Sequence, residues 1–154
     1  MSKMKHKSKV ETLKKVDNPA LIFNIAINGT RKDRVLRTIW LQRKKMLHVA
    51  TLNPEYIMEA RRNDKFKSIL ARCLTVADGH GVVWAHKILN HKCSNSQIER
   101  ISGVELVEAI LQHASREGEK VFLLGAGEGE AEKAAAQMSK KYPDLQMSSY
   151  SGAK

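Results

Sequence analysis

Three turns in this sequence combine glycine with polar side chains, at points where an apolar run gives way to a helical pattern. They are Thr51-Leu52-Asn53-Pro54, Ala77-Asp78-Gly79-His80-Gly81 and Gly125-Ala126-Gly127-Glu128-Gly129. In open α/β sheets, ligands bind at the carboxyl ends of the strands, where strand-to-helix turns gather. If the three preceding strands are parallel, the turns lie at one edge, and the sequence predicts a binding site there.

Asp78 is the residue of the second turn that could exchange a proton with a substrate. Gly79 and Gly81 carry no side chain, so a substrate can approach the backbone closely. A carboxylate held on rigid backbone could serve there as a general base. An ordinary turn or N-cap aspartate is the alternative, and the Asp-Gly dipeptide taken alone favours it.

The third turn resembles a phosphate-binding loop. Gly125 and Gly127 leave backbone N–H groups near the start of a helix, where an anion is favoured. However, the spacing is not that of the dinucleotide fingerprint G-x-G-x-x-G, and three nearby glutamates would repel a pyrophosphate. A tight connection between strand and helix explains the glycines equally well.

Arg100 stands just before another predicted helix and could bind a diphosphate through its guanidinium group. A surface arginine is the ordinary alternative. His80, His86, His91 and Cys93 follow one another closely but match no metal-binding spacing, so we expect no structural metal.

Apolar runs that suggest strands alternate with helical patterns along the chain. Strands are expected at residues 21–27, 46–52, 74–77 and 120–124, with another after Pro143. Helices are expected at residues 31–45, from Pro54, at 64–73, 82–89, 102–118 and 130–141. This alternation predicts an α/β fold, a Rossmann-like layered domain with a mainly parallel sheet flanked by helices.

Four of these helices have cap signals at their starts. The expected caps are Thr30 with Asp33, Asn53 with Pro54, Asp64, and Ser102 with Glu105 in a capping box.

Length and composition indicate one globular domain, because the chain has 154 residues, of which 42% are hydrophobic and 28% charged. Residues 1–18 are rich in lysine and are expected to form a basic flexible arm, with the α/β domain over residues 19–154. No apolar run approaches the roughly 18–20 residues of a membrane span, and no signal-peptide cleavage site is evident. We therefore expect the protein to remain in the cytoplasm. Two cysteines imply no disulfide framework.

The net charge of +11 is concentrated in one half of the chain. Residues 1–77 contain 18 Lys and Arg but 6 Asp and Glu, whereas residues 78–154 contain 9 and 10. This asymmetry favours an anionic partner, which could be a phosphate, a nucleic acid or an acidic membrane surface. Aromatic residues make up only 5% and no RNA-recognition motif accompanies the charge, so nucleic acid is disfavoured. A solvated basic face is the ordinary alternative.

Taken in order, five segments resemble the WecG/TagA/CpsF family of bacterial glycosyltransferases, and the resemblance covers about residues 22–152. The segments are Thr51-Leu52-Asn53-Pro54-Glu55, Ala77-Asp78-Gly79-His80-Gly81-Val82-Val83-Trp84-Ala85, Glu99-Arg100-Ile101-Ser102-Gly103, Val121-Phe122-Leu123-Leu124-Gly125 and Ala131-Glu132-Lys133-Ala134-Ala135.

The resemblance implies a metal-independent, inverting transfer of an N-acetylmannosamine-type sugar from a UDP-sugar donor, without a cofactor. The implied acceptor is a polyprenyl-diphosphate-linked N-acetylglucosamine at the inner face of the cell membrane. The product would enter teichoic acid or a related surface polysaccharide. The identity of the sugar stays open.

The same resemblance implies roles for individual residues. Asp78 falls on the family's proposed catalytic base, and Arg100 falls on the arginine that handles the diphosphate. Thr51 and Asn53 fall on residues that line the substrate pocket. We also expect Gly79, Gly81, Gly125 and Gly127 to contact the substrate through their backbone.

Two departures from the family pattern affect these expectations. The loop from Asn90 to Ile98 is longer than the usual connection. The later family segments, a P-K-Q-E-type motif and a C-terminal membrane-binding appendage, have no match here, so we expect the family's C-terminal portion to be lacking. An exposed apolar surface left in this way would favour a homo-oligomer. A non-catalytic nucleotide- or polyanion-binding α/β module is therefore the alternative function.

Overall fold

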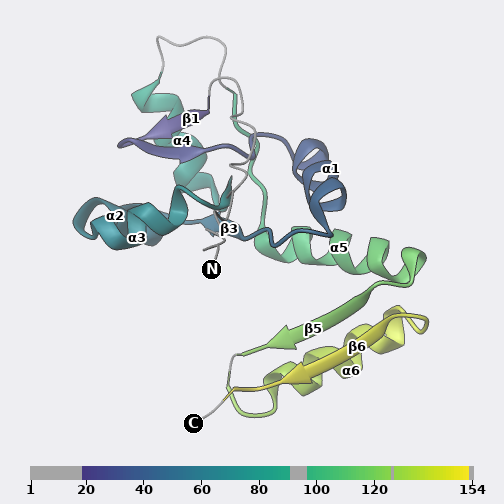
Figure 1. The fold of residues 1–154 in the computed structure, drawn as a ribbon. Coiled ribbons are helices and arrows are strands. Elements are labelled where there is room, and N and C mark those ends of the chain that lie inside the picture. Colours follow the sequence, from purple (N-terminus) through teal and green to yellow (C-terminus); the bar gives the residue numbers. More distant parts are fainter. Residues whose placement is uncertain (1–18, 91–96, 126, 153–154) are drawn as a thin grey trace, which may run out of the picture. The chain divides into compact units, whose positions relative to one another are not determined.

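The structure, a computed structural model, describes residues 19–90, 97–125 and 127–152 (Figure 1). It divides into two compact units, which meet in the sequence between Ile101 and Ser102 and are considered separately below. Both units alternate strands with helices and contain a short parallel strand pair flanked by helices. The predicted α/β, Rossmann-like fold class is thereby confirmed.

The first unit contains four strands and four helices within its described residues. In chain order these are β1 (Ala20–Ile22), β2 (Ile25–Ile27), α1 (Lys32–Gln42), β3 (Val49–Leu52), α2 (Pro54–Arg62), α3 (Asp64–Leu70), β4 (Leu74–Ala77) and α4 (His80–Leu89). Buried apolar side chains of β1, β2, β3, β4, α2, α3 and α4 form a core cluster.

The single strand expected over residues 21–27 is wrong, because this segment is an antiparallel hairpin. Ile22 pairs with Ile25, and the two residues between them, Phe23 and Asn24, have φ angles of 48° and 61°. Two consecutive left-handed residues form the kind of tight turn that matches the twist of a hairpin. The reversal lets Ile22, Ile25 and Ile27 all reach the core.

β3 and β4 form a parallel pair in which Leu52 lies opposite Ala77. All four residues of β4 are buried. The other edge of β4 is occupied by Asn28 and Gly29, whose backbone N–H groups donate to the Thr75 hydroxyl and the Thr75 carbonyl. The Asn28 side chain also accepts from the Thr75 N–H at 2.7 Å and donates to the Cys73 carbonyl at 3.1 Å. The side-chain amide of Asn28 thus acts as part of a neighbouring strand.

Gly29 is required by this close approach. A Cβ at position 29 would lie 2.6 Å from Val76 Cγ1, 2.8 Å from Val35 Cγ2 and 3.0 Å from the Thr75 carbonyl oxygen. The first two distances are shorter than real contacts of a Cβ atom, and the third is tight, so no larger residue fits without a shift of Val76 or Val35.

The predicted helix caps are partly correct. Asn53 caps α2 as expected, with its Oδ1 accepting from the Tyr56 N–H at 2.8 Å. The cap of α3 is Asn63 and not Asp64, because Asn63 Oδ1 accepts from the Phe66 N–H.

The other two predicted caps are wrong. α1 has Arg31 at its N-cap, not Thr30, and no side chain of its own caps it. Ser102 stands at the N-cap of α5, but its side chain makes no cap bond, so the part of the capping box expected from Ser102 does not form.

The second unit contains α5 (Gly103–Glu117), β5 (Lys120–Leu124), α6 (Glu130–Lys141) and β6 (Gln146–Tyr150). α5 ends at Gly118 in the left-handed conformation, and α6 covers the predicted residues, which confirms both expectations. β5 and β6 pair in parallel, with α6 packed along them (Figure 1). Their small core contains Leu111, Ala114 and Leu145.

The expectation that three turns share one sheet edge is only partly met. The turns after β3 and β4 lie side by side because those strands pair. The turn after β5 belongs to a separate two-stranded sheet within the described residues. None of the helices in the described parts of the chain is long and apolar enough to cross a membrane.

Candidate functional site

Asp78 lies immediately after β4, and its backbone N–H donates to the Leu52 carbonyl at 2.8 Å. The following residue, Gly79, is the N-cap of α4, and no side chain caps that helix. Asp78 is therefore not the N-cap, which was one of its ordinary alternatives. Its side chain is only half buried, and no group among the described residues hydrogen-bonds or pairs with its carboxylate. A carboxylate in this position is available to a substrate.

Gly79 and Gly81 open the backbone around Asp78 in two ways. Gly79 has a φ of 90°, which side chains rarely adopt, and a Cβ there would point into open space. A Cβ at Gly81 would lie 3.3 Å from Pro54 Cγ, so the first turns of α2 and α4 are in contact. The two helix N-termini, whose dipoles favour anions, therefore meet beside Asp78.

Thr51 belongs to β3, the strand next to β4, and Asn53 comes directly after that strand. Thr51 lies opposite Val76 and is half buried, on the face of β3 that does not carry the buried Ala50 and Leu52. Asn53 follows Leu52 and uses its Oδ1 to cap α2. Its amide nitrogen donates to no group among the described residues, so this nitrogen can serve a ligand.

Residues 98–101 hold Arg100 next to this edge. The Ile101 N–H donates to the Ala77 carbonyl at 2.8 Å, so Arg100 and Asp78 flank one backbone hydrogen bond. Ile98 and Ile101 are buried on either side of Arg100, which fixes the path of the segment.

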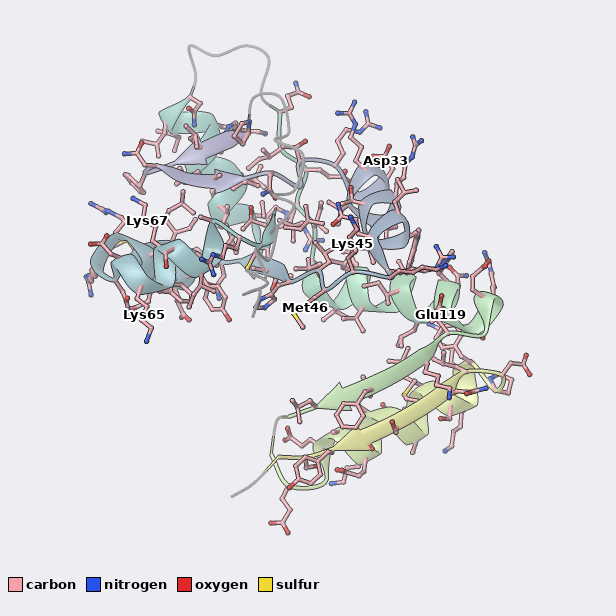
Figure 2. All side chains as sticks on the ribbon, viewed as in Figure 1. Asp33, Lys45, Met46, Lys65, Lys67 and Glu119 are labelled. Carbon is pink, nitrogen blue, oxygen red and sulfur yellow. The ribbon has the colours of Figure 1, made fainter. Side chains whose placement is uncertain are left out.

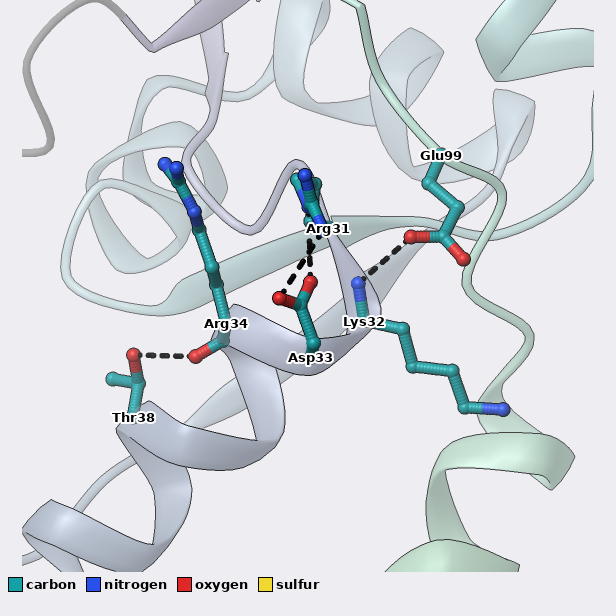
Figure 3. A network of polar contacts seen from close by, with 6 residues as sticks. All are labelled: Arg31, Lys32, Asp33, Arg34, Thr38 and Glu99. Atoms are coloured by element: carbon teal, nitrogen blue, oxygen red, sulfur yellow. Dashed lines mark hydrogen bonds and ion pairs between the residues drawn. The ribbon is translucent and has the colours of Figure 1, made fainter.

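Glu99 ties the same segment to the start of α1. Its backbone N–H donates to the Thr30 carbonyl at 2.9 Å, and its Oε2 accepts from the Lys32 N–H at 2.9 Å (Figure 3). Glu99 therefore supplies the helix cap that Thr30 was expected to provide. Asp33 is turned instead toward Arg31, whose hydrogen bond lowers the pKa of the Asp33 carboxyl. Figure 3 shows the Arg31–Asp33 and Lys32–Glu99 contacts at the first turn of α1.

The described part of the first unit carries a clear excess of positive charge. It contains 14 Lys and Arg but 6 Asp and Glu. Two of these basic residues, Lys65 and Lys67, belong to α3 (Figure 2). A positive charge of this size attracts anions at long range.

Comparison with known proteins gives the family. The model of the "Glycosyl transferase WecG/TagA/CpsF family" matches residues 20–153. The chain belongs to this family.

Two relatives to which the chain is similar carry the name N-acetylglucosaminyldiphosphoundecaprenol N-acetyl-beta-D-mannosaminyltransferase. The one from Bacillus spizizenii is 26% identical over 117 residues, which are 75% of this chain and 44% of the relative. The one from Staphylococcus aureus is 32% identical over 107 residues, which are 69% of this chain and 41% of the relative. The chain thus spans less than half the length of these relatives.

Two further predicted site residues, Gly125 and Gly127, belong to the second unit. The Gly125 N–H donates to the Tyr150 carbonyl, and the Gly127 N–H donates to Glu130 Oε2 at 3.0 Å. Both N–H groups that an anion would use are therefore bonded within the unit, which supports their role as a tight connection. Their contact with substrate stays a prediction.

The histidines of the chain differ in burial. His80 is exposed, whereas His86 is buried in α4, and burial lowers the pKa of its imidazole. His91 and Cys93 lie outside the described residues. Within the described residues, no three His, Cys, Asp or Glu side chains gather as metal ligands do.

Sequence reasoning missed three residues that build this site. The Asn28-Gly29 dipeptide is an ordinary turn signal, and Glu99 stands out only as part of a family segment. The Asn-Gly pair between two apolar runs carries no signal that it will lie against β4, 47 residues away in the sequence. For Glu99, the available signal was its place in the segment Glu99-Arg100-Ile101-Ser102-Gly103. An acidic side chain is favourable near the start of any helix, including one that is distant in the sequence.

Proposed function

We propose that this chain carries the part of a WecG/TagA/CpsF-family glycosyltransferase that activates the hydroxyl group of the acceptor. The proposed reaction transfers an N-acetylmannosamine-type sugar from a UDP donor to a polyprenyl-diphosphate-linked N-acetylglucosamine at the inner membrane surface. The single observation that carries the proposal is the meeting of Asp78, the end of β3 and residues 98–101 at one edge of the β3–β4 pair. The names of the two relatives support the acceptor and the sugar.

Asp78 acts as the general base in this proposal. It accepts the proton of the acceptor hydroxyl while that oxygen attacks the anomeric carbon of the donor sugar. The bond from the anomeric carbon to the UDP oxygen breaks on the opposite side, so the configuration inverts. The absence of any partner for the Asp78 carboxylate within the described residues leaves it ready for this contact.

Arg100 and the N-terminus of α4 would stabilise the departing diphosphate without a metal. A guanidinium group binds a diphosphate in a two-pronged geometry, and uncapped N–H groups at a helix start add further donors. Gly79 lets the chain enter α4 without a side chain over those donors. Thr51 and the Asn53 amide would contact the sugar.

The decisive experiment is turnover of a UDP-N-acetylmannosamine donor with a lipid-linked N-acetylglucosamine diphosphate acceptor, comparing the wild type with Asp78→Asn. Loss of the base is expected to lower kcat by about 10²–10⁴-fold. Asp64→Asn, an exposed aspartate on α3, is the matched control and should leave kcat unchanged. Circular dichroism checks that both variants keep the fold.

Near-normal kcat in Asp78→Asn would refute the base assignment. Activity that disappears with EDTA and returns with a divalent cation would refute metal independence. Binding of UDP with no transfer by the wild type would favour the alternative, a non-catalytic nucleotide-binding module.

A further inference from the structure

α4 has a buried face and an unusually apolar outer face. Val82, Val83 and His86 point into the core. On the outside, Trp84 is 64% exposed and Ile88 is 73% exposed. These two residues are four positions apart and therefore lie on the same side of the helix, one turn from each other. Large apolar side chains gathered on one exposed face commonly mark an interaction site.

The single lysine of α4 fits an anionic partner. The helix contains Lys87, which is exposed next to Ile88, and no aspartate or glutamate. We define the α4 stripe as Trp84, Lys87 and Ile88. The exposed apolar surface continues at the C-terminal end of the helix with Leu89, and there Asn90 Nδ2 donates to the carbonyl of Leu21, which is itself exposed.

We propose that the α4 stripe docks on the surface of an anionic lipid bilayer. Tryptophan is favoured at the boundary between headgroups and acyl chains, and a neighbouring lysine can extend its ammonium to the lipid phosphates. A helix with apolar and basic side chains on one exposed side lies in that boundary rather than across the membrane. A second copy of the chain is the less suitable occupant, because it would bring the same positive charge to the interface.

The position of the stripe links it to the proposed function, on which this part of the inference rests. Trp84 is four residues after His80, the first residue of α4, or about 6 Å along the helix axis. Asp78 immediately precedes Gly79, the N-cap of the same helix. A bilayer that holds the stripe would thus present a lipid-linked diphosphate at the end of α4 where the candidate base lies.

Tryptophan fluorescence can test the docking directly, because the chain has only two tryptophans, Trp40 and Trp84. In a Trp40→Phe variant all emission comes from Trp84. Titration with vesicles of phosphatidylcholine containing phosphatidylglycerol should shift this emission to the blue, and brominated lipids should quench it. Vesicles of phosphatidylcholine alone should give a weaker response.

Flotation with the same vesicles measures the contribution of each side chain. We expect Trp84→Ser and Ile88→Ser each to weaken binding at least tenfold, and Lys87→Gln to weaken it about fivefold on anionic vesicles. The matched control is Leu41→Ser on α1, where Leu41 is 74% exposed but lies outside the stripe. This control should bind as the wild type does.

Three results would overturn the inference. One is vesicle binding with no change in Trp84 emission, and another is an equal loss of binding in Leu41→Ser. The third is a dimer, seen by sedimentation, that dissociates in Trp84→Ser while vesicles bind neither protein.

Turnover separates this inference from the proposed function. The stripe variants should slow transfer to an acceptor embedded in vesicles and leave transfer to a short-chain, water-soluble acceptor unchanged, whereas Asp78→Asn should slow both by about 10²–10⁴-fold. If the wild type transfers to neither acceptor, the proposed function fails and the vesicle measurements still decide the docking.

Discussion

The two parallel strand pairs of this chain have the same pairing geometry but differ in burial. Every residue of β4 is buried, and β3 alternates between buried and half-buried positions. In β5 and β6 every second residue is exposed, including Phe122, Leu124 and Tyr150, which are 54–73% exposed. Parallel sheets are usually covered on both faces, and only β3–β4 approaches that condition.

This difference shows why the candidate site is built on the first pair. Around β4, the backbone is held by β3 on one edge and by Asn28, Gly29 and Ile101 on the other. Side chains at the end of such a strand are held in fixed positions, as a reacting group must be. At β5–β6 the core is small, and the turn after β5 is closed by its own side chains.

The largest difference in stability between the two strand pairs should appear when one leucine in each pair is replaced by alanine. Leu52→Ala, at a fully buried position of β3, is expected to lower the free energy of unfolding by about 2–5 kcal/mol. Leu124→Ala, at a position of β5 that is 73% exposed, should change it by less than about 0.5 kcal/mol. Urea denaturation followed by circular dichroism measures both, and equal losses would contradict the comparison.

A smaller difference in stability is expected between substitutions at two glycines, Gly29 and Gly118, which are required for different reasons. Gly29→Ala crowds Val76 and Val35 and should cost about 1–3 kcal/mol of stability, and Gly29→Asn should cost more because it is larger. Gly118 has a φ of 68° but open space around it. Gly118→Ala should therefore cost about 1 kcal/mol, and Gly118→Asn less, because asparagine tolerates the left-handed conformation. Thermal unfolding of the four variants gives this ranking, and the same order at both sites would argue against it.

The smallest effect on stability is expected at the starts of α1 and α5. Glu99→Ala removes the cap of α1 and should cost about 1 kcal/mol, whereas Glu99→Gln keeps an acceptor oxygen and should lose less. Ser102→Ala removes a side chain that makes no cap bond to α5, so stability should change by less than about 0.5 kcal/mol. A larger loss in Ser102→Ala than in Glu99→Ala, measured by urea denaturation, would reverse the assignment of the caps.

Local patterns predicted much of the secondary structure and some of the site. The Asn53 cap, the buried strand 74–77 and the helix 130–141 depend on residues within a few positions of one another, and all three are confirmed. Asp78 and Arg100 came from short motifs together with a family resemblance. Since residues after parallel strands gather at one edge, the sequence also placed Asp78 beside Asn53 correctly.

The tertiary structure alone decided which distant segments complete the edge of β4 and the start of α1. Asn28 bonds to Thr75 across 47 residues, and Glu99 bonds to Lys32 across 67. It also decided that residues 20–27 fold back as a hairpin and that β5 pairs only with β6 among the described strands. The reason is physical. A helical pattern such as that of residues 130–141 depends on neighbours in the sequence, whereas a strand edge or an open helix start accepts whichever segment satisfies its N–H and C=O groups, and the local sequence does not specify that segment.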